Sequence, residues 1–97
     1  MGPVPLYPVY FRGVAYLSAK RLTEAENELK KILDHRGIVL NSPIGALAHL
    51  QLGRAYVLSG DTSKAKIAYK DFLTLWKDAD PDIPSYKQAK AEYAKLQ

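Results

Sequence analysis

Leu52-Gly53-Arg54-Ala55-Tyr56 opens the stretch of sequence that decides the fold, and Gly60-Asp61, Ala65 and Tyr69 complete it. Because it has no Cβ, Gly53 lets its helix approach a neighbour closely, at an axis separation of about 8–10 Å. Ala65 supplies the small residue that we expect across that crossing, and Gly60 favours a tight helix end. The stretch therefore predicts two antiparallel helices that pack closely around a short turn.

The same pattern occurs once more, 40 residues earlier in the chain. Gly13-Val14-Ala15-Tyr16-Leu17 corresponds to the segment around Gly53, and in both copies an alanine follows the glycine after twelve residues. The agreement spans two consecutive helices, which indicates an internal repeat. Its signature residues, which we expect in the core within and between the hairpins, are Gly13, Tyr16, Ala25, Leu29, Gly53, Tyr56, Ala65 and Tyr69.

Helix-end signals extend this prediction to the whole chain. Thr23 and Glu26 form a capping-box pattern, Pro43 suits the first turn of a helix, and Asp61 or Thr62 is expected to cap the next helix. No segment alternates apolar and polar residues as a half-buried strand would. We therefore expect an all-α fold of five helices, over about residues 8–19, 23–36, 43–59, 62–77 and 85–96.

Composition sets limits on the chemistry of the chain. Its 97 residues suit one small domain, and the lack of cysteine excludes disulfides, thiolate nucleophiles and cysteine-based zinc sites. No apolar run approaches the roughly 20 residues that span a bilayer, so we expect no membrane contact from this segment. The compartment stays open: cytoplasmic by default, but extracytoplasmic if a membrane segment precedes this domain in a longer protein.

The repeated motif resembles the tetratricopeptide repeat. Gly-x-Ala-Tyr in a first helix, followed by an alanine and then by an aromatic residue or leucine, is typical of that family, and residues 52–69 are the closer copy. The first copy departs from the pattern at Val9, Arg12 and Lys20, where the family prefers Trp, Leu and Gly. The stretch from Leu33 to Pro84 is also similar to the C-terminal repeat regions of bacterial eukaryote-like serine/threonine kinases and related signalling proteins.

The resemblance implies a right-handed α-solenoid in a single domain, residues 1–97. Repeat 1 would span about residues 6–37 and repeat 2 about 43–79, with a capping helix at about 84–97. An apolar connector at 37–42 accounts for the difference between 40 residues and the family's spacing of about 34. Two repeats are few for a solenoid, so we expect the last helix or another chain to cover its end.

No constellation in the sequence points to catalysis, a metal or a cofactor. His35 and His49 are fourteen residues apart on different predicted helices, and we interpret them as a helix-end residue and a packing residue. Asp78, Asp80 and Asp82 alternate like the start of a calcium loop, but prolines interrupt the segment and no closing glutamate follows. We therefore expect a protein that is not an enzyme and that has no catalytic residue, cofactor or metal.

The net charge of +4 and the pI near 9.3 raise the question of nucleic-acid binding. The lysines of the last two predicted helices are interleaved with Asp71, Asp78 and Glu92, and they do not form one stripe. We interpret them as a solvated outer face, and we expect no nucleic-acid partner.

In the tetratricopeptide family the first helix of each hairpin lines a concave groove. Carried onto this chain, the groove would be mostly apolar and aromatic with Arg54 as its charge, and it would suit an amphipathic helix or an extended apolar peptide. The alternative is that some of these side chains, above all Leu50 and Val57, belong to the core or lie beneath the last helix. The expected lining is Tyr7, Tyr10, Val14, Leu17, Leu47, Leu50, Gln51, Arg54 and Val57, with Lys87 or Gln88 offered by the last helix.

These observations favour a scaffold module that binds a protein or peptide partner and forms part of a larger bacterial protein. The alternative is a structural domain that associates with other copies of itself through exposed repeat faces. The sequence does not identify the partner, because the variable residues of the groove lie outside the repeated motif.

Overall fold

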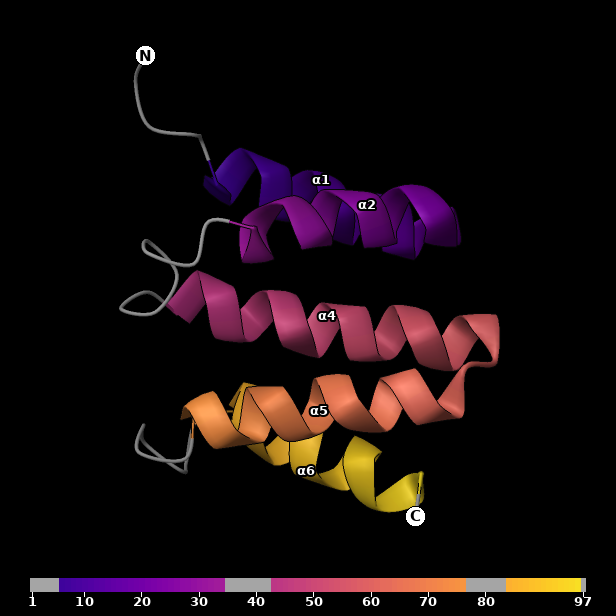
Figure 1. Cartoon of the computed structure of the whole chain (residues 1–97), viewed down its shortest axis with the longest axis vertical. Coiled ribbons are helices and arrows are strands. Elements are labelled where there is room, and N and C mark those ends of the chain that lie inside the picture. Colours follow the sequence, from indigo (N-terminus) through magenta and orange to yellow (C-terminus); the bar gives the residue numbers. More distant parts are fainter. Residues whose placement is uncertain (1–5, 35–42, 77–83, 97) are drawn as a thin grey trace.

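The computed structural model describes residues 6–34, 43–76 and 84–96, and within them it contains five α-helices and no strand (Figure 1). The helices are α1 (Leu6–Ser18), α2 (Leu22–Leu33), α4 (Pro43–Ser59), α5 (Thr62–Trp76) and α6 (Pro84–Lys95). The all-α prediction with five helices is therefore confirmed. The expected roles of the connector at 37–42, of His35 and of the Asp78–Asp82 segment lie outside the described residues.

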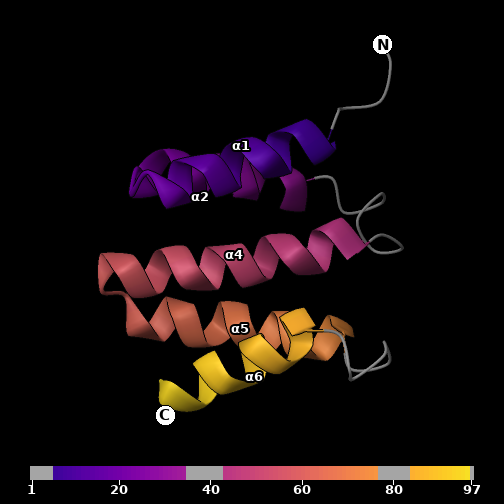
Figure 2. The ribbon, with the colours of Figure 1, turned by 180° about the vertical axis from the view of Figure 1, so that it is seen from behind.

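The helices pack in chain order. α1 and α2 form one hairpin, α4 and α5 form a second, α2 lies beside α4, and α6 lies against α5 (Figures 1 and 2). Smaller contacts join α1 directly to α4. As a result α4 lies at the centre of the array, with α1 and α2 on one side and α5 on the other.

The turns inside the two hairpins have the same hydrogen bonds. The Arg21 amide donates to the Tyr16 carbonyl at 2.8 Å, and 40 residues later the Asp61 amide donates to the Tyr56 carbonyl at 2.9 Å. Both turns place the preceding residue in the left-handed region, Lys20 with φ 62° and Gly60 with φ 84°. This is the Schellman arrangement, which satisfies the last carbonyls of a helix. The repeat in the sequence is thus also a repeat in backbone structure.

A close contact at each repeated glycine fixes the spacing of the helices. A Cβ added to Gly13 would lie 2.9 Å from Leu29 Cγ, and one added to Gly53 would lie 3.0 Å from the ring of Tyr69. Ala25 and Ala65 are fully buried, but the nearest side chains to the two glycines are Leu29 and Tyr69 rather than these alanines. Each hairpin is therefore held by a glycine on its first helix and a large side chain on its second.

The start of α2 differs from the prediction. The helix begins at Leu22 with Arg21 as its N-cap, and no side chain caps it, so the capping box at Thr23 and Glu26 is wrong. The reason is the left-handed Lys20, which turns the chain early and places Thr23 inside the helix. Glu26 instead pairs with Lys30 Nζ at 2.8 Å. In the second hairpin Asp61 is the cap, because its Oδ1 accepts a hydrogen bond from the Lys64 amide at 3.1 Å.

The core consists of two clusters of buried side chains. One fills the space between the two hairpins, and the other joins α4 and α5 to α6; half-buried Tyr56 packs against both. Tyr16 is also half-buried and lies beneath the guanidinium of Arg21. The first cluster is Val9, Leu29, Ile32, Ile44, Ala48, Leu52 and Ala68, and the second is Ala46, Leu50, Ala65, Tyr69, Phe72 and Ala89.

The left-handed residue in each turn gives a prediction about stability. A non-glycine residue in this conformation costs roughly 1–2 kcal/mol, part of which glycine recovers. We expect Lys20→Gly to raise the free energy of unfolding by about 1 kcal/mol, measured by urea denaturation. The matched control is Gly60→Ala: its Cβ would meet nothing within 4 Å, so a loss of about 1 kcal/mol would arise from φ alone. Equal midpoints for Lys20→Gly and the parent chain would contradict this explanation.

Candidate functional site

The side chains expected to line a groove do not form one continuous open surface. Leu50 is only 1% exposed and belongs to the core cluster beneath α6, whereas Val57 is 42% exposed. Tyr10, Val14, Leu17 and Leu47 are half-buried, and the side chain of Tyr7 lies outside the described residues. The alternative expectation, that these residues belong to the core or lie beneath the last helix, therefore holds for Leu50 and does not hold for Val57.

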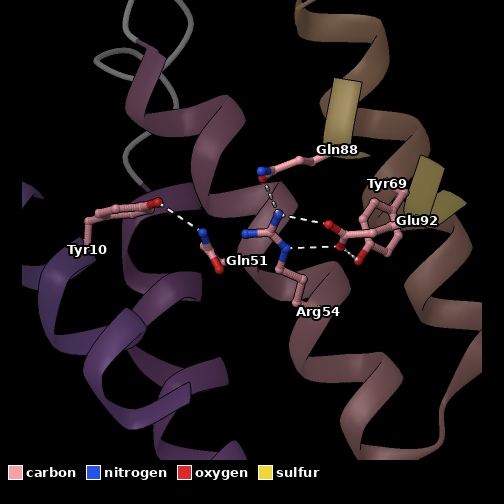
Figure 3. Close-up of polar contacts among 6 residues, drawn as sticks. All are labelled: Tyr10, Gln51, Arg54, Tyr69, Gln88 and Glu92. Carbon is pink, nitrogen blue, oxygen red and sulfur yellow. Dashed lines mark hydrogen bonds and ion pairs between the residues drawn. The ribbon is translucent and has the colours of Figure 1, made fainter. Parts of the chain in front are cut away.

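Tyr10 and Gln51 join the first helices of the two hairpins. Gln51 Nε2 donates a hydrogen bond to the Tyr10 hydroxyl at 3.2 Å, and both side chains are partly buried (Figure 3). This bond links residues 41 positions apart and fixes the groove side of α1 against α4. The two polar side chains thus satisfy one another at the junction.

Arg54 is paired with α6. Its Nε donates a hydrogen bond to Glu92 Oε1 at 3.0 Å, and its Nη2 donates one to Glu92 Oε2 at 2.9 Å (Figure 3). The guanidinium therefore binds the carboxylate through two parallel hydrogen bonds. Nη2 also donates to Gln88 Oε1 at 3.4 Å. A fork of this kind fixes the orientation of both partners. The residue that the sequence offered as the charge of the groove therefore orients the last helix on α4.

Tyr69 completes this group of polar contacts. Its hydroxyl donates to Glu92 Oε1 at 2.5 Å, so one carboxylate oxygen accepts hydrogen bonds from both Tyr69 and Arg54 (Figure 3). Burial and the bond to Glu92 raise the pKa of Tyr69. For Glu92, burial acts to raise the pKa, but the bonds from Arg54 and Tyr69 outweigh it and hold the pKa below its ordinary value. The carboxylate is therefore charged at neutral pH.

An apolar hollow of about 390 Å³ is lined by residues of α1, α4, α5 and the C-terminal part of the chain from α6 on. Val57 and Leu58 on α4 are 42% and 52% exposed there, and the Arg54–Glu92 pair forms its polar edge. Three of the expected groove residues are among its lining: Leu17, Arg54 and Val57. The full lining is Leu17, Arg54, Val57, Leu58, Tyr69, Glu92, Lys95 and Leu96.

The sequence interpretation missed the part of this site that comes from α6. It named Lys87 or Gln88 as that helix's contribution, whereas Glu92, Lys95 and Leu96 line the hollow. One signal was present, because Glu92 is the single acidic residue of the helix and stands among lysines. The sequence could not identify Arg54 as the partner of Glu92, because the two residues are 38 positions apart.

A smaller hollow, of about 210 Å³, lies between α2, α4 and α5. Its floor is aliphatic, and Lys30, His49, Lys64 and Asp71 stand around it. Burial lowers the pKa of His49, although Asp71 acts in the opposite direction with an oxygen 3.9 Å from Nδ1. His49 is therefore largely neutral at pH 7 and serves as a half-buried packing residue, as expected from its position one turn before Gly53.

Among residues 6–34, 43–76 and 84–96, no group of three His, Asp or Glu side chains is placed to hold a metal ion. Within the same ranges no helix has the length and apolar character needed to cross a membrane. What the arrangement offers is a preformed apolar surface with a fixed ion pair at its edge.

The described residues thus form two similar helical hairpins and a final helix, with two hollows on their surface. No family model matches the sequence, and neither a curated protein nor a solved structure matches the chain. Its function is therefore inferred from its own residues.

The contact between α4 and α6 gives a prediction about pH dependence. The folded pKa of Glu92 lies below its ordinary value of 4.5, so the pair adds stability above about pH 4.5 and loses it as the pH falls through the folded pKa. In a double-mutant cycle with Arg54→Met and Glu92→Gln, we expect a coupling of about 1 kcal/mol at pH 7, since both side chains are near one-third exposed.

The same cycle measured by urea denaturation should give a smaller coupling as the pH falls below 4.5 and passes through the folded pKa of Glu92. The matched control is the more exposed pair Arg21 and Glu24 at the start of α2, which leaves α6 untouched. A coupling at Arg54 and Glu92 that is independent of pH between 3 and 7 would show that the carboxylate charge is not what joins the helices.

Proposed function

We propose that the chain is a non-catalytic binding module of the tetratricopeptide-repeat kind, which holds a protein or peptide partner at the hollow between α1, α4 and α6. The observation that carries this proposal is the exposure of Val57 and Leu58 side by side in a nearly apolar depression. Exposed apolar surface gathered in a concave site with a few polar groups is typical of ligand and protein contacts.

The repeated architecture supports the class of module. The two hairpin turns have matching hydrogen bonds, and the two glycine contacts occur at matching positions 40 residues apart. Arrays of helical hairpins present their first helices on one surface, and binding to such surfaces depends on shape and apolar contact. Half of the lining of the hollow comes from the first helices α1 and α4, which this class uses for binding.

The lining favours a helical or extended segment with a protruding aliphatic residue. Leu17, Val57 and Leu96 provide apolar walls, and a volume of about 390 Å³ accepts one or two such side chains. Arg54 and Glu92 already satisfy each other, so the edge adds orientation without leaving an unpaired charge under the partner. An apolar residue flanked by polar residues that reach Lys95 would fit this geometry.

A second copy of the chain is the other candidate occupant. The exposed pair Val57 and Leu58 would serve equally well as the centre of a symmetric contact. Light scattering over a dilution series distinguishes the two, because self-association at this surface makes the mean mass rise with concentration. A constant monomeric mass up to millimolar concentration would leave the partner proposal alone.

The proposal predicts which surface change abolishes binding. Peptides selected from a displayed random library against the intact chain should bind Val57→Asp at least about tenfold more weakly, because a carboxylate in the apolar hollow loses its hydration. Ile67→Asp is the matched control, since Ile67 is an aliphatic residue on α5 that is 62% exposed and lines the smaller hollow rather than this one. Binding is measured by fluorescence anisotropy.

The outcome that contradicts the proposal is equal affinity for the Val57→Asp and Ile67→Asp chains. Both changes introduce the same charge on an exposed helical position, so a nonspecific effect of charge would lower affinity in both. Circular dichroism of the two chains checks that each remains helical.

A further inference from the structure

Among the described residues, the last helix buries fewer side chains than α5 does. Of its described side chains, residues 86–96, only Ala89 is fully buried, whereas α5 buries Ala65, Ala68, Tyr69 and Phe72. Tyr93 and Leu96 are partly buried against the same cluster. A helix of twelve residues has little stability in isolation. The attachment of α6 therefore combines one fully buried side chain, Ala89, and two partly buried ones with the polar group around Glu92.

These two anchors are three residues apart, so they lie on one face of α6. Ala89 enters the core cluster that α4 and α5 form, where its neighbours include Leu50 and Phe72. One turn further on, Glu92 receives Arg54 of α4 and Tyr69 of α5 (Figure 3). The surface beneath α6 is thus a slot that accepts a small side chain and, at the next turn, a carboxylate.

Charge complementarity makes the slot selective. Without α6, Arg54 would stand beside a donor hydroxyl with no carboxylate to bind, over exposed Leu50 and Phe72. A lysine or a leucine at the position of Glu92 would leave that guanidinium without its carboxylate partner. Only a helix with a carboxylate in this register satisfies both Arg54 and Tyr69.

We propose that the surface of α4 and α5 beneath α6 is a second docking surface, which takes an amphipathic helix of a partner protein in place of α6. The partner helix carries a small residue followed three positions later by glutamate, as Ala89 and Glu92 do. This rests on the proposed function, because Arg54 and Tyr69 of the slot also line the hollow. In the free chain α6 occupies the slot and competes with the partner.

Competition of this kind has a measurable consequence. A partner binds only the fraction of molecules whose α6 is released, so its apparent affinity is reduced by that fraction. Loosening α6 without altering the slot should therefore strengthen binding. Ala89→Gln does this, because the longer side chain does not fit a fully buried position, and every residue of α4 and α5 stays unchanged.

The probe is a fluorescein-labelled peptide with residues 84–96 of this chain, titrated into the full chain and followed by anisotropy. We expect the Ala89→Gln chain to bind it at least about tenfold more tightly than the parent chain does. Ala91→Gln is the matched control: it makes the same replacement at an exposed position of the same helix, and it should bind as the parent does.

A reversal of charge tests the register. The peptide with Glu92→Arg should not bind the Ala89→Gln chain, but it should bind the Arg54→Glu chain in preference to the unaltered peptide. Should Ala89→Gln disturb folding, Glu92→Gln in the full chain releases α6 with a side chain of the same size and should also strengthen binding. Amide exchange in α4 and α5 verifies that the slot remains folded.

Two results overturn the proposal. One is a Glu92→Gln or Ala89→Gln chain that exposes α6 to amide exchange yet binds the peptide no better than Ala91→Gln. The other is a dimer of the Ala89→Gln chain formed by exchange of α6, which would assign the slot to a second copy. Library peptides that bind the Val57 hollow while the 84–96 peptide does not would refute the slot alone and leave the proposed function intact.

Discussion

The contact of the Tyr69 ring with the backbone at Gly53 is the constraint on which the rest of the second hairpin depends. The ring lies so close to Gly53 that a Cβ at residue 53 would be only 3.0 Å from it. The ring is therefore held in place, and Tyr69 is 1% exposed. Fixing the ring also fixes its hydroxyl, which reaches Glu92 at 2.5 Å. A glycine on α4 thereby determines where the carboxylate of α6 is received, and Arg54, one residue after Gly53, meets the same carboxylate.

The first hairpin has the same contact with a different consequence. Leu29 takes the place of Tyr69 beside Gly13, and an aliphatic side chain offers no hydroxyl to the next element. The junction between the hairpins is therefore mainly apolar, through Ile32 and Leu52, with the bond between Tyr10 and Gln51 on its groove side. The junction with α6 instead adds a group of polar contacts around Glu92 to the apolar contacts of Ala89, Tyr93 and Leu96. The hydroxyl in that group comes from a change of residue type at equivalent repeat positions, from Leu29 to Tyr69.

The sequence predicted what depends on local pattern and failed where distant residues meet. The five helices and the glycine positions follow from periodicity and helix ends, which are local. The capping box at Thr23 failed because Lys20 adopts a left-handed conformation that no propensity assigns to lysine. The pairing of Arg54 with Glu92 could not be predicted, because it depends on how α6 packs on α4. For the same reason the burial of Leu50 was one of two open alternatives.

Selectivity rather than strength is what a partly exposed ion pair provides at such a junction. A pair of this kind adds about 1 kcal/mol or less, because water still reaches both charges. The same pair strongly disfavours a helix that lacks the carboxylate, since Arg54 and the Tyr69 hydroxyl would then be covered without an acceptor. An apolar side chain at position 92 would hold α6 by burial alone and would accept many registers. With Glu92, the slot accepts a helix in one register only and binds it weakly. These two properties together allow one helix to replace another.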